Sequence, residues 1–199
     1  MSALAVEPGP DNGSTWDRLV HFWQELDWPE GCKVEIIEGI VTMAPTPASS
    51  HNYIAHLVHR DLYRVIPEDW AVCQTQSVAM PPNLNMFIPD LLVVPSAALK
   101  KPGCHIPAEA AELVVEITPP SNAQQDRIQK LRGYASAGVP LYLLLDSWAS
   151  NCPSATLYGE PKNGMYRVLE VAQYGEGIHL PEPFGLTIDT GAFPVPPLR

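Results

Sequence analysis

Long apolar runs are absent from this sequence of 199 residues, which contains no stretch of about eighteen apolar residues that could cross a membrane. The first residues, MSALAVEPGP, also lack the basic start and apolar core of a signal peptide. Cysteines are few and scattered, and Cys32, Cys73, Cys104 and Cys152 include no CxxC pair. This spacing argues against a zinc site or a disulfide framework. We therefore expect a cytoplasmic protein with reduced thiols and no membrane partner.

Positive charge is also scarce, since 12 Lys and Arg residues stand against 22 Asp and Glu residues for a net charge of −10. Non-specific binding to duplex DNA depends on Lys and Arg side chains that neutralise phosphates. The composition therefore argues against tight non-specific binding, but it leaves room for a nucleic-acid enzyme with a local basic patch. Lys100, Lys101, Arg127 and Arg132 are candidates for such a patch, although a solvated face explains them equally well.

The remaining composition, with 46% hydrophobic and 17% charged residues, is typical of a globular protein. We expect a loose tail over residues 1–13 and a single domain over 14–199. Helical spacing or β-rich alternation predicts the elements in turn. These are a helix at 14–26, a hairpin at 33–45, a helix at 49–66, strands at 71–79, 86–94 and 112–117, a helix at 122–137, a buried central strand at 141–146, and short edge strands near 155–158, 166–172 and 185–189. The order predicts an α/β or α+β domain with a mixed sheet.

Two acidic residues interrupt apolar runs of β type: Asp90 in IPDLLVV and Glu116 in LVVEI. Burying a charge costs several kcal/mol unless a partner compensates for it. If the two strands are neighbours, repulsion between the carboxylates at about 5 Å amounts to roughly 3 kcal/mol. Such a pair either shares a proton or binds a divalent cation, and carboxylates favour Mg²⁺ or Mn²⁺. The alternative for Asp90 is a turn residue that follows Pro89.

Lys130 lies on the predicted helix that follows the strand of Glu116. Side chains on a helix tilt toward its N-terminus, so the ammonium group is expected to point back toward the end of that strand. Lys130 and Asp126 would lie about 40° apart, off the apolar stripe of Ile128, Leu131 and Ala135. The ammonium group would then stand beside a metal ion, although an ordinary i,i+4 ion pair with Asp126 remains an alternative.

Several motifs occur in a recognisable order: EIIEG at 35–39, PTPASSH at 45–51, PD, VVEIxxPS, DxxxKxxxY and AGVPxYxLLD. Together they resemble the Uma2 family of bacterial endonucleases, which belongs to the PD-(D/E)xK restriction-endonuclease-like superfamily, over about residues 15–190. The resemblance implies a restriction-endonuclease-like core with a mixed central sheet flanked by helices, an N-terminal helix and a β-hairpin. It also implies Mg²⁺- or Mn²⁺-dependent hydrolysis of DNA, and a homodimer.

The resemblance assigns roles to single residues. Asp90 matches the aspartate of the motif and Glu116 its central acid, so both are expected to bind the metal. Thr118 stands where the usual ExK motif has its lysine, and Lys130 matches a lysine that has migrated to the next helix. Glu35 matches an acid that could complete the metal shell, unless it is a solvated hairpin residue. His51 could support a metal ligand or transfer a proton, unless it is an ordinary residue at a helix start.

A second class of function stays open, namely a nuclease-fold protein that binds nucleic acid or a protein partner without cutting. The acidic composition and the absent ExK lysine favour this alternative. The pair of Asp90 and Glu116 favours the enzyme, because a binding module gains nothing from two buried acids that repel each other. An acid-dyad glycosidase would need a cleft rich in aromatic residues, and nothing in the sequence requires one.

Overall fold

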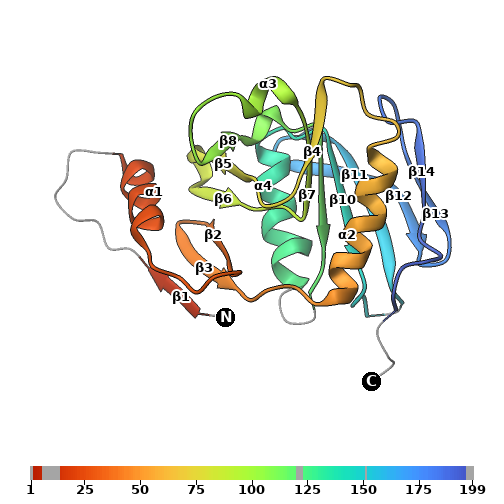
Figure 1. The fold of residues 1–199 in the computed structure, drawn as a ribbon, viewed down its shortest axis with the longest axis horizontal. Helices are drawn as coiled ribbons and strands as arrows, with labels where there is room; N and C mark the ends of the chain where they lie inside the picture. Colours follow the sequence, from red (N-terminus) through yellow and green to blue (C-terminus); the bar gives the residue numbers. More distant parts are fainter. Residues whose placement is uncertain (1, 6–13, 120–122, 151, 196–199) are drawn as a thin grey trace.

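The computed structural model describes residues 2–5, 14–119, 123–150 and 152–195 (Figure 1). The chain forms two six-stranded mixed sheets and a separate two-stranded sheet. The first sheet has the order β1-β3-β2-β6-β5-β8, and the second has the order β12-β11-β10-β9-β7-β4. The mixed α/β architecture agrees with the fold class predicted from the sequence.

The bounds of the strands are as follows. The first sheet contains β1 (Ser2–Ala5), β2 (Lys33–Ile37), β3 (Ile40–Ala44), β5 (Ser77–Met80), β6 (Asn85–Phe87) and β8 (His105–Pro107). The second sheet contains β4 (Trp70–Cys73), β7 (Leu91–Pro95), β9 (Leu113–Ile117), β10 (Leu141–Asp146), β11 (Ser154–Lys162) and β12 (Met165–Gln173). The two-stranded sheet consists of β13 (Gly177–Leu180) and β14 (Leu186–Asp189).

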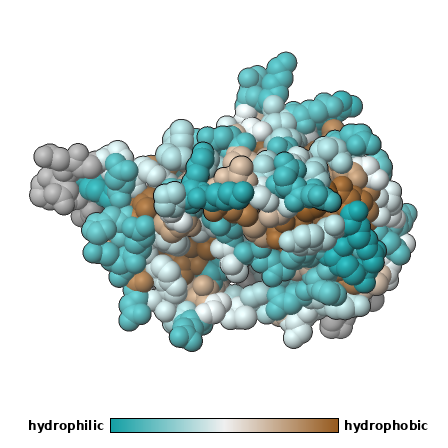
Figure 2. Space-filling model, turned by 45° about the horizontal axis from the view of Figure 1, so that its top comes forward, coloured by the Kyte–Doolittle hydropathy of each residue, from teal (hydrophilic) through white to brown (hydrophobic). Residues whose placement is uncertain are grey.

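The helices lie between the strands in the sequence. The α-helices are α1 (Thr15–Glu25), α2 (Ser49–Leu62), α3 (Ser96–Leu99) and α4 (Leu131–Ser136), with short turns η1 (Pro81–Asn83) and η2 (Ala108–Ala110) and a π-helix, η3 (Gln125–Lys130). Among the described residues, no helix is long and apolar enough to cross a membrane. All four cysteines are free thiols. Figure 2 shows one face of the molecule, where hydrophilic residues surround smaller hydrophobic areas.

The N-terminal helix and hairpin form as predicted. Ser14 caps α1 through a capping box with Asp17, which satisfies backbone donors at the helix start. Trp23 packs on the hairpin β2–β3, and its indole nitrogen donates a hydrogen bond to the carbonyl of Val34 at 2.9 Å. Residues 2–5 differ from the expected loose tail, because they form β1 and pair with β3. The rest of the expected tail, residues 1 and 6–13, lies outside the described residues.

Side chains of the central strands point alternately to the two faces of the second sheet, so the hydrophobic residues of this sheet form two clusters. On β9, Val115 and its alternate neighbours pack toward α2 and the sheet β13–β14. Val114 faces the opposite cluster, which includes Tyr134 of α4 and Phe87 of the first sheet. Strand β10 is fully buried and runs parallel to β9, as expected of a central strand joined by a helical crossover. The cluster that contains Val114 therefore lies between the two six-stranded sheets and includes side chains from both.

Two predicted strands are each divided between the two sheets. The strand expected at 71–79 is broken near Thr75, whose φ of 63° turns the chain from β4 in the second sheet to β5 in the first. The strand expected at 86–94 is broken by Pro89 between β6 and β7. At the C-terminal side, β11 and β12 are nine-residue strands rather than the short ones predicted. These breaks bring the first sheet onto one face of the second.

The helix expected at 122–137 contains two α-helical residues at 123 and 124, the π-helix η3 and then α4, while residue 122 lies outside the described residues. A π-helix has i→i+5 hydrogen bonds, so the angles of an α-helix do not apply to it. Asp126 and Lys130 are buried on η3, whereas Ile128 is 38% exposed. The prediction that Ile128 belongs to the buried stripe was therefore wrong, although Ala135 is buried as expected.

Candidate active site

The register of two strands brings the two predicted acids together. Strands β7 and β9 are antiparallel, with Leu91 opposite Val115. Continuing this register by one residue places Asp90 opposite Glu116, on the sheet face that looks toward η3 and the first sheet. The backbone N–H of Ile117 donates a hydrogen bond of 2.8 Å to Oδ2 of Asp90. The acids therefore lie side by side on neighbouring strands.

Asp90 is surrounded by hydrogen-bond donors and is only 7% exposed. The ammonium group of Lys33, at the start of β2, lies 2.6 Å from Oδ1. Nε2 of His51, in the first turn of α2, lies 2.9 Å from Oδ2. Burial would raise the pKa of Asp90, but Lys33 and His51 outweigh burial and hold this pKa well below its usual value. Asp90 is therefore a carboxylate at neutral pH.

Glu116 belongs to a second group of contacts, centred on Lys130. Its Oε1 atom accepts hydrogen bonds of 3.0 Å from Nζ of Lys130 and from the hydroxyl of Tyr134. The same Nζ atom lies 3.0 Å from Oε1 of Glu35 and 3.4 Å from Oδ1 of Asp126. A single ammonium group, only 4% exposed, thus neutralises part of the charge of three buried carboxylates.

The charges of these residues do not balance. Glu35, Asp90, Glu116 and Asp126 face the ammonium groups of Lys33 and Lys130, so four carboxylates against two ammonium groups leave a formal excess of two negative charges.

Burial raises the pKa of Glu116 well above its usual value, while Lys130 opposes this rise and Asp126 and Asp90 add to it. Burial likewise raises the pKa of Asp126 to about 6, against the opposing effect of Lys130. Contacts with Glu116 and Glu35 outweigh burial at Lys130 and raise its pKa well above the usual value.

The donor set fits a hard divalent cation. Carboxylate oxygens are the ligands that such ions prefer, and two positive charges would compensate for the formal excess of two negative charges that arises when all four acids are ionised. Nδ1 of His51 is buried and has no hydrogen-bond partner within the described part of the chain. Within that same part, no three His, Cys, Asp or Glu side chains are already gathered as metal ligands. The ammonium groups of Lys33 and Lys130 lie against the carboxylate oxygens instead.

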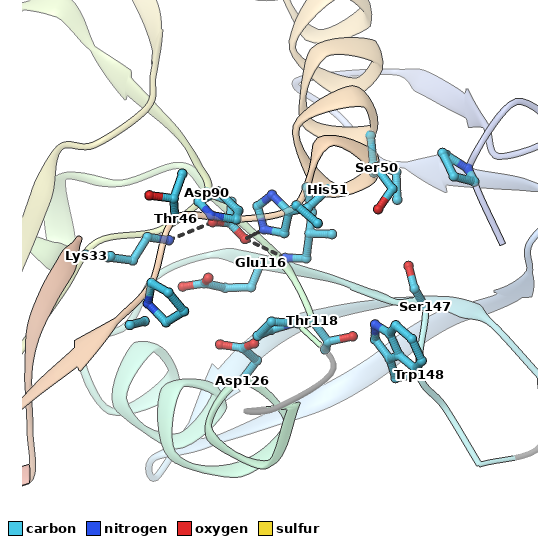
Figure 3. Close-up of a pocket in the computed structure, with 18 of the residues that line it drawn as sticks. Lys33, Thr46, Ser50, His51, Asp90, Glu116, Thr118, Asp126, Ser147 and Trp148 are labelled. Atoms are coloured by element: carbon cyan, nitrogen blue, oxygen red, sulfur yellow. Dashed lines mark hydrogen bonds and ion pairs between the residues drawn. The ribbon is translucent and has the colours of Figure 1, made fainter. Parts of the chain in front are cut away.

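These side chains form one wall of a cavity of about 540 Å³. Figure 3 shows Lys33, Asp90, Glu116 and Asp126 gathered at one side, with Ser147 and Trp148 across the cavity. The remaining lining is largely apolar and comes from the segment before α2 and from the C-terminal end of the described chain. All five predicted site residues line this cavity: Glu35, His51, Asp90, Glu116 and Lys130.

A second ion pair holds η3 against the end of β10. Asp146 accepts hydrogen bonds from Arg127 at 2.7 and 2.9 Å and from the hydroxyl of Thr118 at 2.8 Å. Arg127 also donates to the carbonyl of Trp148 at 2.8 Å. Thr118, which stands where the resemblance would place a lysine, thus supports Asp146. Arg127 is engaged in this pair, whereas Lys100, Lys101 and Arg132 are exposed.

We expect the substitution Asp146→Asn to lower the free energy of unfolding by about 2 kcal/mol at pH 7, because it removes a charge-assisted, two-point contact. Burial would raise the pKa of Asp146, but Arg127 and Thr118 outweigh burial and lower it. The contribution of Asp146 is therefore present at neutral pH and is lost as the pH falls through this lowered pKa.

Urea denaturation at pH 7 and near pH 3 measures both effects. The difference between wild type and variant should shrink at the lower pH. Equal unfolding midpoints of the two proteins at pH 7 would show that this ion pair does not stabilise the fold.

Three residues near the predicted acids were not recognised from the sequence as parts of the site. Lys33 lies two positions before Glu35, and the two-residue period of a strand places both on one face. Asp126 was considered only as a partner of Lys130 in a helix ion pair. Tyr134 belongs to the DxxxKxxxY motif, but no pattern in the sequence predicted a partner for its hydroxyl. The period of β2 was the available signal for Lys33.

Comparisons with known proteins agree with this architecture. The sequence matches the protein family Uma2, described as "Putative restriction endonuclease", over residues 22–191. A crystal structure from Anabaena variabilis, described as a putative nuclease belonging to DUF820, is similar with a TM-score of 0.68 and 18% sequence identity. The similarity covers 88% of this chain and 96% of that chain, and at this identity it shows a shared fold. Among curated proteins, none matches the sequence.

Proposed function

Because the chain belongs to the Uma2 family, we propose that it is an endonuclease that hydrolyses phosphodiester bonds of DNA and depends on Mg²⁺ or Mn²⁺. The observation that supports this proposal is the gathering of four acidic side chains around two lysines on one wall of the cavity. Asp90 and Glu116 are the residues that would hold the cation. A cation bound there would lower the pKa of a water molecule and take up charge from a phosphate oxygen.

The residues of the chain orient this site. His51 and the backbone N–H of Ile117 fix Oδ2 of Asp90 from two sides. Lys130 holds Glu116 close to the other acids and so limits the repulsion between them. In the proposed reaction, the oxygen of a water molecule bonds to phosphorus while one P–O ester bond breaks. The products are a phosphate monoester and a free hydroxyl group, and the leaving oxygen takes up a proton.

A second candidate function is a nuclease-fold protein that binds nucleic acid or a protein partner without cutting. Two observations favour it: the net charge of −10, and Thr118 with its hydroxyl bound to Asp146 in place of a lysine. The charge would restrict non-specific binding, because few cations are available to replace the counterions of DNA.

Incubation of the purified protein with supercoiled plasmid tests the proposal directly. We expect nicked and linear products with Mg²⁺ or Mn²⁺, and no products with an excess of EDTA, because the carboxylates alone cannot activate water. Cleavage that persists in EDTA would contradict the dependence on metal. Absence of cleavage with either cation, on plasmid and on single-stranded DNA, would favour the binding module.

Thermal denaturation tests whether a cation binds at Asp90, whether or not the protein cleaves DNA. A cation at one hundred times its dissociation constant stabilises the native state by about 2.7 kcal/mol. Mn²⁺ should therefore raise the Tm of the wild type, and it should not raise the Tm of Asp90→Asn. Equal shifts for both proteins would place the bound cation elsewhere.

A further inference from the structure

The two lysines of the cavity have different surroundings. Lys130 is 4% exposed and lies between three carboxylates, so it cannot contact a substrate without leaving them. The side chain of Lys33 is 23% exposed, and within the described residues it pairs with one carboxylate, that of Asp90. Figure 3 shows Lys33 reaching toward Asp90 at the edge of the cavity. Of the two, Lys33 is the one that a ligand in the cavity can reach.

The two oxygens of Asp90 are occupied unequally. Oδ2 accepts from Nε2 of His51 and from the backbone N–H of Ile117, which uses both of its lone pairs. Oδ1 accepts only from Lys33 among the described residues, and therefore keeps one lone pair. A cation that binds Asp90 would accordingly bind Oδ1, where the ammonium group already lies. Two cations on one oxygen repel each other strongly in a buried site.

The two groups that donate to Oδ2 of Asp90 are less free to move than the side chain of Lys33. One is a backbone group of β9, and the other is a ring held in the first turn of α2. Lys33 instead has a flexible four-carbon stem with rotatable donors and stands at the first position of β2. Repulsion would therefore displace Lys33 rather than His51.

We propose that Lys33 exchanges partners: it neutralises Asp90 until a divalent cation binds at Oδ1, and it then contacts a phosphate oxygen of the ligand in the same cavity. The identity of that ligand as a DNA phosphodiester rests on the proposed function, whereas the exchange of cations at Asp90 does not. Lys130 then acts as a positioning residue for Glu116, and Lys33 is the lysine that touches substrate.

Titration calorimetry with Mn²⁺ tests the exchange without any substrate. We expect Lys33→Met to bind Mn²⁺ about tenfold more tightly than the wild type, because the competing cation is gone. Lys33→Arg, which keeps the charge, should bind Mn²⁺ about as the wild type does. The matched control is Lys162→Met, which removes an exposed lysine of β11 and should leave the affinity unchanged. Unchanged or weaker affinity of a folded Lys33→Met variant would overturn the exchange.

A second measurement tests the contact with phosphate. With saturating Mn²⁺, low concentrations of inorganic phosphate should raise the Tm of the wild type and of Lys162→Met, but not that of Lys33→Met. Equal shifts in all three proteins would overturn the phosphate contact. Both measurements remain decisive if the wild type cuts no DNA, so failure of the proposed function is distinguishable from failure of this inference.

Where DNA cleavage is observed, Lys33→Met should change the affinity for Mn²⁺ and the cleavage rate in opposite directions. Lys33→Met should cleave about a hundredfold more slowly although it binds Mn²⁺ more tightly, since one charge contact to the transition state is missing. Lys33→Arg should recover part of the rate. A variant that binds Mn²⁺ more tightly and cleaves at the rate of the wild type would also contradict the phosphate contact.

Discussion

Replacement of Asp90 by Asn, or of Glu116 by Gln, is expected to lower DNA cleavage by at least about a thousandfold, equivalent to about 4 kcal/mol of transition-state stabilisation. Both substitutions keep the shape of the side chain and remove the charge that would hold the cation. Initial rates of plasmid nicking with Mn²⁺ measure the effect. Circular dichroism should show that both variants retain the fold.

The matched control is Glu109→Gln, the same change at an exposed acid on η2. It should cleave at the rate of the wild type. If Asp90→Asn and Glu116→Gln also cleave at that rate, the two buried acids have a structural role and the proposed reaction at this site is wrong.

Replacement of Lys130 by Met is expected to lower the free energy of unfolding by about 3 kcal/mol at pH 7.5, because three buried carboxylates lose their shared counterion. The length of the side chain is nearly preserved, so the change is mainly one of charge. Urea denaturation measures this difference against the wild type. Lys162→Met, at an exposed position, should change the free energy of unfolding by no more than about 0.5 kcal/mol.

The decrease in the free energy of unfolding caused by Lys130→Met should become smaller as the pH falls from about 7.5 to about 5.5. Burial already raises the pKa of Glu116 and that of Asp126 in the wild type, the latter to about 6. Without Lys130 the folded state would hold these protons still more strongly than the unfolded state does. A group with a raised pKa in the folded state stabilises the fold at low pH and loses this contribution as the pH rises. A loss that is equal at both pH values would contradict this account of the charges.

The positions of Asp90 and Glu116 were predictable because both interrupt apolar runs of β type. Burial of such runs follows from composition, and antiparallel or parallel pairing of neighbouring strands then brings their polar residues together. Helix geometry added Lys130, the family resemblance added Glu35 and His51, and the structure places all three at the same cavity. The division of two predicted strands between sheets was not predictable, because local β propensity does not indicate which sheet a strand joins.

The burial of Lys130 could not be predicted from the local sequence pattern. An i,i+4 pair of Asp126 and Lys130 is ordinary on an exposed helix, and α-helical geometry places it off the apolar stripe. The π-helix η3 buries both residues instead and leaves Ile128 exposed. Contacts with Glu35 and Glu116, which lie far away in the sequence, stabilise this arrangement. Lys33 was missed for a related reason, since a lysine at the start of a strand is usually solvated.

The cavity draws its walls from almost the full length of the chain, from Lys33 of β2 to Val195 near the end of the described residues. During synthesis on a ribosome, Lys33, Glu35 and His51 would emerge long before Lys130 and Trp148. The carboxylate cluster can therefore form only after both sheets have packed together, late in the synthesis of the chain. A truncated translation product would contain some of the acids without the arrangement that gathers them at one cavity.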